Sequence, residues 1–262
     1  MSVVVIGDRS VGKSSTVLEL ANPYNKNCVE IVEPDYETLR ENYINPDTNQ
    51  MVPTRTEEQQ PLVLNVQLPG GEKQVNSVWI DTPGEMWDSP QWRQENPAAW
   101  QDFKTRLNEC VGIILLLPPH RDLVSPNLLN VANDHHTLNR DDLLNFQAWE
   151  NRLGKWLDFF LQDCSQVEHI AICLHKADLF CNVDKVSREF QYNYAGGTQW
   201  WKFNETARKK YFYQVEKNIK NYHQRGGKPI QFFITSIKNR GLLELPWLYL
   251  SPYILYQDHN SY

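Results

Sequence analysis

The stretch Gly7-Asp8-Arg9-Ser10-Val11-Gly12-Lys13-Ser14 has the spacing G-x-x-x-x-G-K-S. Four apolar residues precede it, as in a buried strand, and residues 15–20 after it are compatible with a helix. In this strand–loop–helix context the glycines let backbone N–H groups turn inward around an anion, and the helix N-terminus adds positive charge. Lys13 supplies a full charge, and Ser14 a hydroxyl for a phosphate-bound magnesium ion. We therefore predict a site for a nucleoside polyphosphate. Its expected contacts are Gly7, Asp8, Arg9, Ser10, Val11, Gly12, Lys13, Ser14 and Ser15.

The composition limits what kind of protein this is. With 262 residues, of which 41% are apolar and 12% aromatic, the chain is long enough to bury a full core. Its net charge of −6 argues against a surface that wraps nucleic acid. No run reaches about 18 apolar residues, so no transmembrane segment is expected. The first residues enter a strand at once and leave no room for a secretion signal, so we expect a cytoplasmic protein.

The cysteines are also typical of a cytoplasmic protein. They are odd in number, and several lie in apolar runs, as expected of buried and reduced thiols. They are Cys28, Cys110, Cys164, Cys173 and Cys181. Cys173 and Cys181 lie near His169 and His175, but alternation along a strand would separate some of these side chains, so no zinc site is expected.

Several segments have the pattern of strands. Residues 62–68 alternate apolar and polar side chains, and residues 75–80 follow after a Pro-Gly-Gly turn, which predicts a hairpin. Residues 110–117, 169–174 and 230–235 are continuously apolar, as in parallel strands covered on both faces.

Helical patterns alternate with these strands. One apolar stripe runs over residues 149–161 and includes two tryptophans, which we interpret as core packing. A second runs over residues 207–222 and ends at two glycines. Strands alternating with helices predict an α/β fold in three layers, with a mostly parallel six-stranded sheet, one antiparallel edge strand and helices on both faces.

No linker divides the chain, so a single domain over residues 1–262 is expected. Polar insertions interrupt it near residues 22–60, 85–109 and 118–142. Near the C-terminus, residues 242–256 are apolar and aromatic but contain two prolines, which predict a short helix followed by an extended aromatic arm.

Two further motifs follow predicted strands. Trp79-Ile80-Asp81-Thr82-Pro83-Gly84 closes the second hairpin strand. A carboxylate there, beside the phosphate loop, can hold magnesium directly or through water, which makes Asp81 a candidate ligand. The backbone N–H of Gly84 can reach a γ-phosphate, which only a triphosphate has.

The second motif is His175-Lys176-Ala177-Asp178. Asp178 can accept hydrogen bonds from N1–H and the exocyclic amino group of guanine, whereas adenine presents neither donor. The aliphatic stem of Lys176 can cover the base. After the last strand, Thr235-Ser236-Ile237-Lys238 can present backbone N–H groups to the guanine oxygen.

The order of these motifs resembles that of Ras-like small GTPases, in the translation-factor-related class of P-loop GTPases, over most of residues 1–245. The resemblance implies the P-loop GTPase fold and a site for GTP or GDP with Mg²⁺. It also implies that Lys13 and Ser14 contact phosphate and magnesium, that Gly84 senses the γ-phosphate, and that Asp178 reads guanine. The family carries a threonine ahead of the hairpin that joins magnesium when triphosphate is bound; Thr54 is our choice, and Thr56 is the alternative.

Three residues depart from the family pattern. Glu85 replaces a water-orienting glutamine and places negative charge near the γ-phosphate. Arg9 replaces a small glycine and can crowd the γ-phosphate, point outward or neutralise charge in cis. His175 replaces an asparagine, which lowers the expected guanine affinity without removing specificity. The catalytic candidates are Lys13, Glu85, Arg9 and Thr54, and we expect hydrolysis that is slow or is activated by a partner.

The leading hypothesis is a regulatory GTPase. GTP and Mg²⁺ would order the Thr54 loop and the Gly84 segment, which then dock a protein effector, and a GTPase-activating partner would assist turnover. The alternative is a catalytically weak or inactive scaffold module that holds GTP or GDP in a larger assembly. Tryptophans 87, 92 and 100 either anchor a partner or fold back onto the core.

Overall fold

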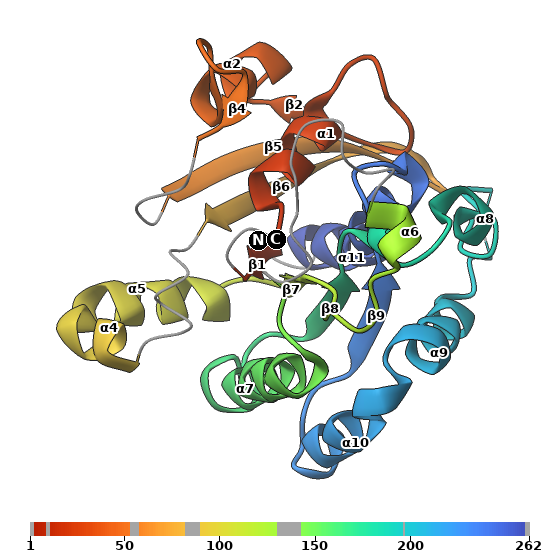
Figure 1. Ribbon diagram of the computed structural model, residues 1–262. Helices are drawn as coiled ribbons and strands as arrows, with labels where there is room; N and C mark the ends of the chain where they lie inside the picture. The colour runs from red at the N-terminus through yellow and green to blue at the C-terminus, as the bar shows by residue number, and fades with distance from the viewer. Residues whose placement is uncertain are drawn as a thin grey trace.

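The computed structural model describes residues 3–8, 11–52, 58–81, 90–129, 143–195 and 197–259. Its centre is a seven-stranded sheet in the order β2-β5-β6-β1-β7-β8-β9 (Figure 1). These strands are β1 (Val3–Gly7), β2 (Val29–Glu33), β5 (Glu58–Leu68), β6 (Gly71–Asp81), β7 (Gly112–Leu117), β8 (His169–Leu174) and β9 (Ile230–Ile234). From β6 to β9 all neighbours pair in parallel, which confirms the α/β fold class with a mainly parallel sheet, consistent with a P-loop GTPase fold.

Two details of the predicted sheet are wrong. It has seven strands rather than six, and its antiparallel strand, β5, lies second from the edge instead of at it. The edge is β2, which runs antiparallel to β5 and hence in the same direction as β6. This short strand lies inside the polar insertion 22–60. Within the strand only Val29 and Ile31 are buried, and two of its five residues are glutamates. Pairing with β5 therefore stabilises a segment whose own pattern is weak.

The predicted hairpin is confirmed, with Leu68 paired to Gly71 across a tight turn. The apolar segments 110–117, 169–174 and 230–235 correspond to β7, β8 and β9. Their side chains are almost entirely buried, because helices cover both faces of the sheet.

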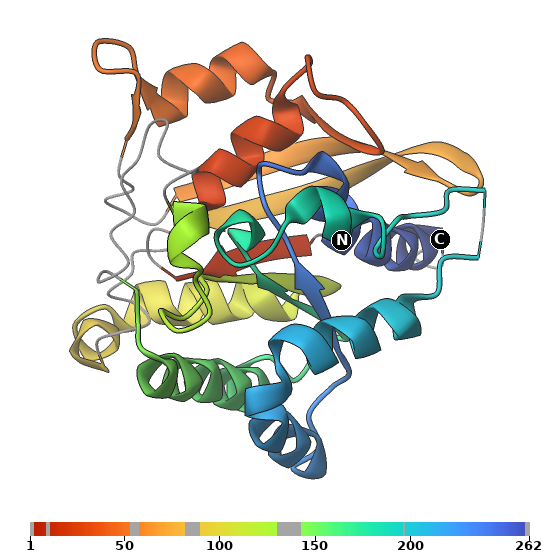
Figure 2. The ribbon, with the colours of Figure 1, turned by 45° about the vertical axis from the view of Figure 1, so that its right-hand side comes forward.

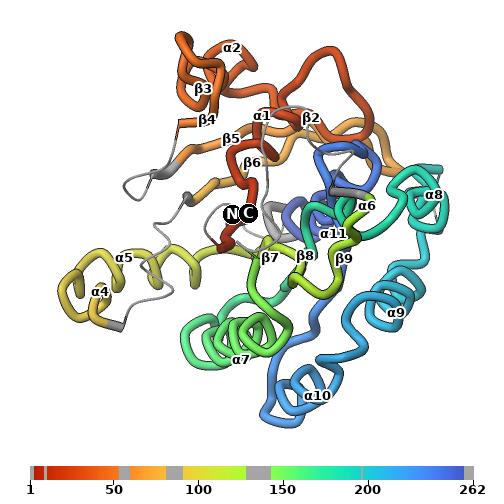
Figure 3. Tube along the Cα trace, in the orientation of Figure 1, coloured from red at the N-terminus to blue at the C-terminus, as the bar shows by residue number. Residues whose placement is uncertain are grey.

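The helices form the outer two layers. They are α1 (Lys13–Ala21), α2 (Tyr36–Tyr43), α4 (Pro90–Glu95), α5 (Pro97–Asn108), α6 (Pro126–Leu129), α7 (Phe146–Asp163), α8 (Val183–Ser187), α9 (Trp200–Tyr211), α10 (Glu216–Gln224) and α11 (Arg240–His259). Helices α1 and α11 pack together on one side of the sheet, and α5 and α7 lie on the other (Figure 1). Beside β2 and α1, α2 and the small hairpin of β3 (Ile44–Asn45) and β4 (Gln50–Met51) form a projecting unit (Figure 3).

The tryptophan-rich stripe is confirmed as core. Trp149, Leu153, Trp156 and Phe160 of α7 are all buried against the sheet. The second predicted stripe forms two helices rather than one, because α9 ends at Tyr211 and a short 3-10 turn precedes α10. At the break Phe212 is fully buried, and its ring centroid lies 4.7 Å from that of Phe232 in β9.

The predicted C-terminal arm is wrong. Helix α11 continues without interruption to His259, and both Pro246 and Pro252 lie inside it. Its apolar residues are buried on the sheet, including Trp247, Leu250 and Ile254. Burial of these apolar side chains offsets the loss of the backbone hydrogen bonds that the two prolines cannot donate.

The cysteines are free thiols, three of them buried and two half-buried. Burial raises the pKa of Cys110 to about 12 and that of Cys181 to about 11, which keeps both thiols protonated at neutral pH. Within the described ranges no three His, Cys, Asp or Glu side chains gather as a metal site. No helix in the same part of the chain is long and apolar enough to cross a membrane.

Candidate functional site

The candidate site lies where the parallel strands end. Strands β1, β6, β7, β8 and β9 run in one direction, so their carboxyl ends share one edge of the sheet. There the loop after β8 contacts Gly12 at the start of α1, and its Ala177 N–H donates to Thr235 O of the loop after β9. Figure 2 shows the central strands and α1 from the side. In open α/β sheets this edge is the usual place for a ligand.

The two glycines of the phosphate loop are required by close contacts. A Cβ on Gly7 would lie 2.5 Å from the carbonyl oxygen of Leu116 in the neighbouring strand β7. Gly12 caps α1 with a φ of +105°, in the left-handed region that favours glycine. A Cβ there would lie 3.2 Å from Nε2 of His175, so the phosphate loop packs directly on the loop after β8.

Lys13, the first residue of α1, holds its charge inside this loop. The residue is only 6% exposed. Its Nζ donates to the carbonyl oxygens of Gly7 at 3.1 Å and Asp8 at 3.3 Å. The ammonium group therefore lies at the positive end of α1, where a phosphate is expected.

Asp8 has a role that sequence reasoning missed. Its buried carboxylate accepts a hydrogen bond from Nε1 of Trp156 at 3.2 Å, and Nε of Arg152 lies 3.9 Å from the same oxygen. Both partners are on α7, one turn apart. The carboxylate thus attaches the phosphate loop to α7, while the backbone carbonyl of Asp8 faces Lys13. The sequence hints at this contact only through Trp156, which lies in an apolar stripe that core packing is enough to explain.

His175 is a buried, neutral imidazole. Its Nδ1 lies 2.9 Å from Oγ1 of Thr235, and its backbone N–H donates to Leu117 O at 2.8 Å. Burial, with the nearby charge of Lys176, lowers the pKa of His175 to about 3. Its other ring nitrogen, Nε2, faces Gly12. The histidine therefore bridges the phosphate loop and the loop after β9.

The two loops expected to read the base are joined to each other. Ser236 Oγ donates to the carboxylate of Asp178, and the Ala177 N–H donates to Thr235 O at 3.0 Å. Lys176 has a φ of +58°, which turns the chain into the short 3-10 helix Ala177–Leu179. Ile237 is partly buried and Lys238 is exposed at the end of this loop.

The candidate magnesium ligands come from adjacent elements. Ser14 is in the first turn of α1, as is the phosphate-loop residue Ser15. Asp81 ends β6, which pairs with β1. A hydroxyl and a carboxylate oxygen are the donor types that Mg²⁺ prefers. The other residues predicted for the phosphates, magnesium and catalysis lie outside the described residues; they are Arg9, Ser10, Thr54, Thr56, Gly84 and Glu85.

Of the three tryptophans expected as anchor or core, Trp92 and Trp100 are described, and both pack against the core. The Trp100 ring centroid lies 5.7 Å from that of Phe159 in α7, and the Arg93 guanidinium carbon lies 4.3 Å above the Trp100 ring. These contacts support the core interpretation for this pair. Trp87 lies outside the described residues.

Comparisons with known proteins find similarity among solved structures. No family model matches the chain, and no curated protein matches its sequence. Among solved structures, the chain is similar to a nucleolar GTP-binding protein 1 from Plasmodium falciparum, with 12% identity and a TM-score of 0.42. The match covers 99% of this chain and 89% of that one. Function must therefore be inferred from the residues of the site.

Proposed function

We propose that this protein binds GTP and GDP with Mg²⁺, hydrolyses GTP slowly, and uses the nucleotide state to control docking of a protein partner. The observation that carries the proposal is the contact between Gly12 and His175, because it joins a phosphate loop to a guanine-type base loop. A nucleotide has its phosphates and its base at opposite ends. Because the phosphate loop and the loop after β8 are adjacent, one nucleotide can reach the first with its phosphates and the second with its base.

Asp178 supports the choice of guanine. Its carboxylate is held by Ser236, yet a carboxylate offers about four lone-pair positions and can accept further hydrogen bonds. Guanine supplies two donors, N1–H and the exocyclic amino group, whereas adenine would leave this carboxylate without partners from the base. Discrimination built on such unmatched polar groups reaches roughly 10⁴-fold or more.

The phosphates and the metal would be held by the first turn of α1. Lys13 places its charge among the carbonyl oxygens of the loop, where phosphate oxygens would replace them as partners. Ser14 and Asp81 would share a magnesium ion, which neutralises charge on the terminal phosphates when bound. Thr54, or alternatively Thr56, would add a ligand in the triphosphate state.

Slow turnover follows from Glu85 and Arg9. A glutamate beside the γ-phosphate repels it, and an arginine in place of a glycine restricts the space around it. The same residues favour a second candidate function, a module that retains GTP without turning it over. Nucleotide extracted from the purified protein separates the two, since GDP indicates turnover and GTP indicates retention.

The specificity test uses Asp178→Asn. The wild type is expected to bind GDP and to ignore ADP, whereas the variant should lose GDP and gain xanthosine diphosphate, because an amide can donate to the C2 oxygen of xanthine. Calorimetric titration with the three diphosphates measures this. Unchanged GDP affinity in the variant, or equal binding of ADP by the wild type, would contradict guanine recognition.

Hydrolysis is tested separately by single-turnover assays with GTP, with and without Mg²⁺. We expect a rate far below 1 s⁻¹ without a partner, since unassisted Ras-type rates are on the order of 10⁻⁴ s⁻¹. A faster unassisted rate would show that Glu85 and Arg9 do not impede the reaction.

A further inference from the structure

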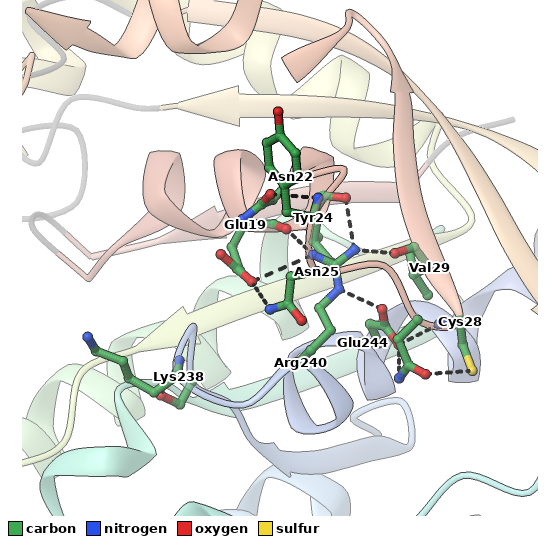
Figure 4. A network of polar contacts seen from close by, with 12 residues as sticks. Glu19, Asn22, Tyr24, Asn25, Cys28, Val29, Lys238, Arg240 and Glu244 are labelled. Atoms are coloured by element: carbon green, nitrogen blue, oxygen red, sulfur yellow. Dashed lines mark hydrogen bonds and ion pairs between the residues drawn. The ribbon is translucent and has the colours of Figure 1, made fainter. Parts of the chain in front are cut away.

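A buried ion pair lies at the start of α11, next to the base loop. Nε of Arg240 donates to Oε1 of Glu244 at 2.7 Å, and the two side chains are only 6% and 0% exposed. Two charges removed from water are tolerated when their remaining polar atoms also find partners. The partners of this pair therefore show what it holds together (Figure 4).

Arg240 binds the far end of the helix that begins at Lys13. Its guanidinium donates to the carbonyl oxygens of Glu19 and Leu20, the latter at 2.9 Å. Both are in the last turn of α1, where carbonyl groups lack partners within the helix. A cation there also complements the helix dipole. Arg240 thus caps the phosphate-loop helix from another part of the chain.

The same pair holds the entry to the edge strand. Arg240 also donates to the carbonyl oxygen of Val29, the first residue of β2. Oε2 of Glu244 accepts from Asn27 Nδ2 at 2.8 Å and from the Cys28 backbone N–H at 3.0 Å. Residues 27–29 are therefore held by α11 (Figure 4) and also by β5, where the Gln67 N–H donates to Cys28 O at 2.7 Å and Val66 pairs with Val29.

The base loop leads directly into this pair. Ser236, which donates to Asp178, forms a β-bridge with Asn239, the residue before Arg240. Asn239 Oδ1 in turn accepts from the Leu242 N–H at 3.1 Å and so starts α11. A continuous set of contacts connects the carboxylate that reads guanine to residues 27–29.

We propose that Arg240 and Glu244 are positioning residues that couple guanine-nucleotide binding to the order of residues 27–29 at the start of β2. This inference rests on the proposed function. The pair fixes the base loop against α1, so weakening it speeds nucleotide release. Because coupling between two sites is reciprocal, bound nucleotide in turn protects residues 27–29.

Cys28 provides a local probe of this coupling. Its thiol is half-buried, so alkylation by iodoacetamide reports how often residues 27–29 open; peptide mass spectrometry separates it from Cys181. In the wild type, GDP should slow Cys28 alkylation several-fold. In Glu244→Gln and Arg240→Lys this protection should be lost, and a fluorescent GDP should dissociate roughly tenfold faster, the effect of losing one such contact.

The matched control is Arg208→Lys, which alters the ion pair of Arg208 with Glu216 between α9 and α10. This variant should change the free energy of unfolding, but its rate of GDP release and its protection of Cys28 by GDP should equal those of the wild type. Asn27→Ala leaves the ion pair intact but removes one contact of Glu244 and the contact of Asn27 Oδ1 with the Cys28 thiol. Its readout is therefore the ratio of the Cys28 alkylation rates without and with GDP, which should fall below the wild-type ratio even where the other variants fail to fold.

The outcomes are distinct. If the wild type binds GDP and every folded variant keeps both the release rate and the protection of Cys28, the inference is wrong, even where the melting temperature falls. If the wild type binds no guanine nucleotide, the proposed function itself is wrong, and the coupling with it.

Discussion

At the scale of single residues, the buried ammonium group of Lys13 supports the most direct prediction. It is held by two backbone carbonyl oxygens at the mouth of the loop, and a charge-assisted bond to phosphate contributes about 1.5–3 kcal/mol. Lys13→Ala should therefore weaken binding of a fluorescent GTP analogue by roughly 10- to 100-fold. Titration by fluorescence anisotropy measures the change.

Lys26→Ala is the control for Lys13→Ala. Lys26 is about half exposed and pairs with Glu30 on the surface, and such pairs contribute little. It should keep wild-type affinity. Equal affinity in wild type and Lys13→Ala would show that Lys13 does not bind the phosphates.

The second residue-scale prediction concerns pH and His175. Burial lowers the pKa of this histidine to about 3 in the folded protein, against about 6.5 in an unfolded chain. Between these values only the unfolded chain binds the proton, so the free energy of unfolding falls as the pH falls. The effect approaches about 1.4 kcal/mol per pH unit.

His175→Asn removes this contribution. Urea denaturation at pH 7 and pH 5 should show the wild type losing about 2 kcal/mol more than the variant over this interval. His120 and His169, whose pKa values burial also lowers, are present in both proteins, so their contributions cancel. Parallel pH profiles would mean that His175 can be protonated in the folded state.

At the scale of elements, α7 is expected to hold the phosphate loop through Trp156. Trp156→Phe keeps an aromatic ring in the core but leaves the buried carboxylate of Asp8 without that donor. We expect the free energy of unfolding to fall by about 2 kcal/mol, the contribution of a hydrogen bond to a charged group, and GDP affinity to fall with it. Urea denaturation and GDP titration measure the two effects.

Trp149→Phe is the matched control on the same helix. The indole of Trp149 donates to the neutral carbonyl oxygen of Pro118 at 2.8 Å, so its loss should cost only about 1 kcal/mol and leave GDP affinity unchanged. An equal loss of affinity in both variants would indicate general loosening of α7 rather than a specific contact with Asp8.

Helix α11 gives a second prediction at this scale. Pro252 is exposed inside the helix and cannot donate to the carbonyl oxygen four residues earlier. Pro252→Ala should raise the free energy of unfolding by about 1–2 kcal/mol, since the gain in helix propensity exceeds the added entropy of the unfolded chain. Urea denaturation checks this. Pro97→Ala, at the first residue of α5 where proline is tolerated, should give no gain.

These elements also show what the sequence could predict. Strands β7, β8 and β9 were predictable because uninterrupted apolar runs have few other ways to be buried. Strand β2 and the continuous α11 were not, because pairing with β5 and packing on the sheet override weak or contrary local preferences. The break between α9 and α10 depends on a contact between Phe212 and Phe232, which local periodicity does not encode.

At the scale of the whole molecule, the parts of the candidate site also differ in whether a single segment of sequence encodes them. The phosphate loop and the Asp178 loop could be predicted because their spacing is local and chemically specific. The bond of Trp156 to Asp8 spans 148 residues, and the cap of Arg240 on Leu20 spans 220, so neither has a signature within a single segment. Tertiary contacts of this kind can be identified only once the sheet order is known.

The final prediction is global stabilisation by the correct nucleotide. One buried core runs from Val3 in β1 to Ile254 in α11, so a ligand held at the ends of the central strands should stabilise the entire cooperative unit. At 100 times its dissociation constant, GDP should add about 2.7 kcal/mol. For a chain of this size that raises the melting temperature by about 5–10 °C. Thermal unfolding with GDP and with ADP at equal concentration measures the difference. A shift with GDP alone is expected, Asp178→Ala should abolish it, and equal shifts with both nucleotides would show that the site holds phosphates without reading the base.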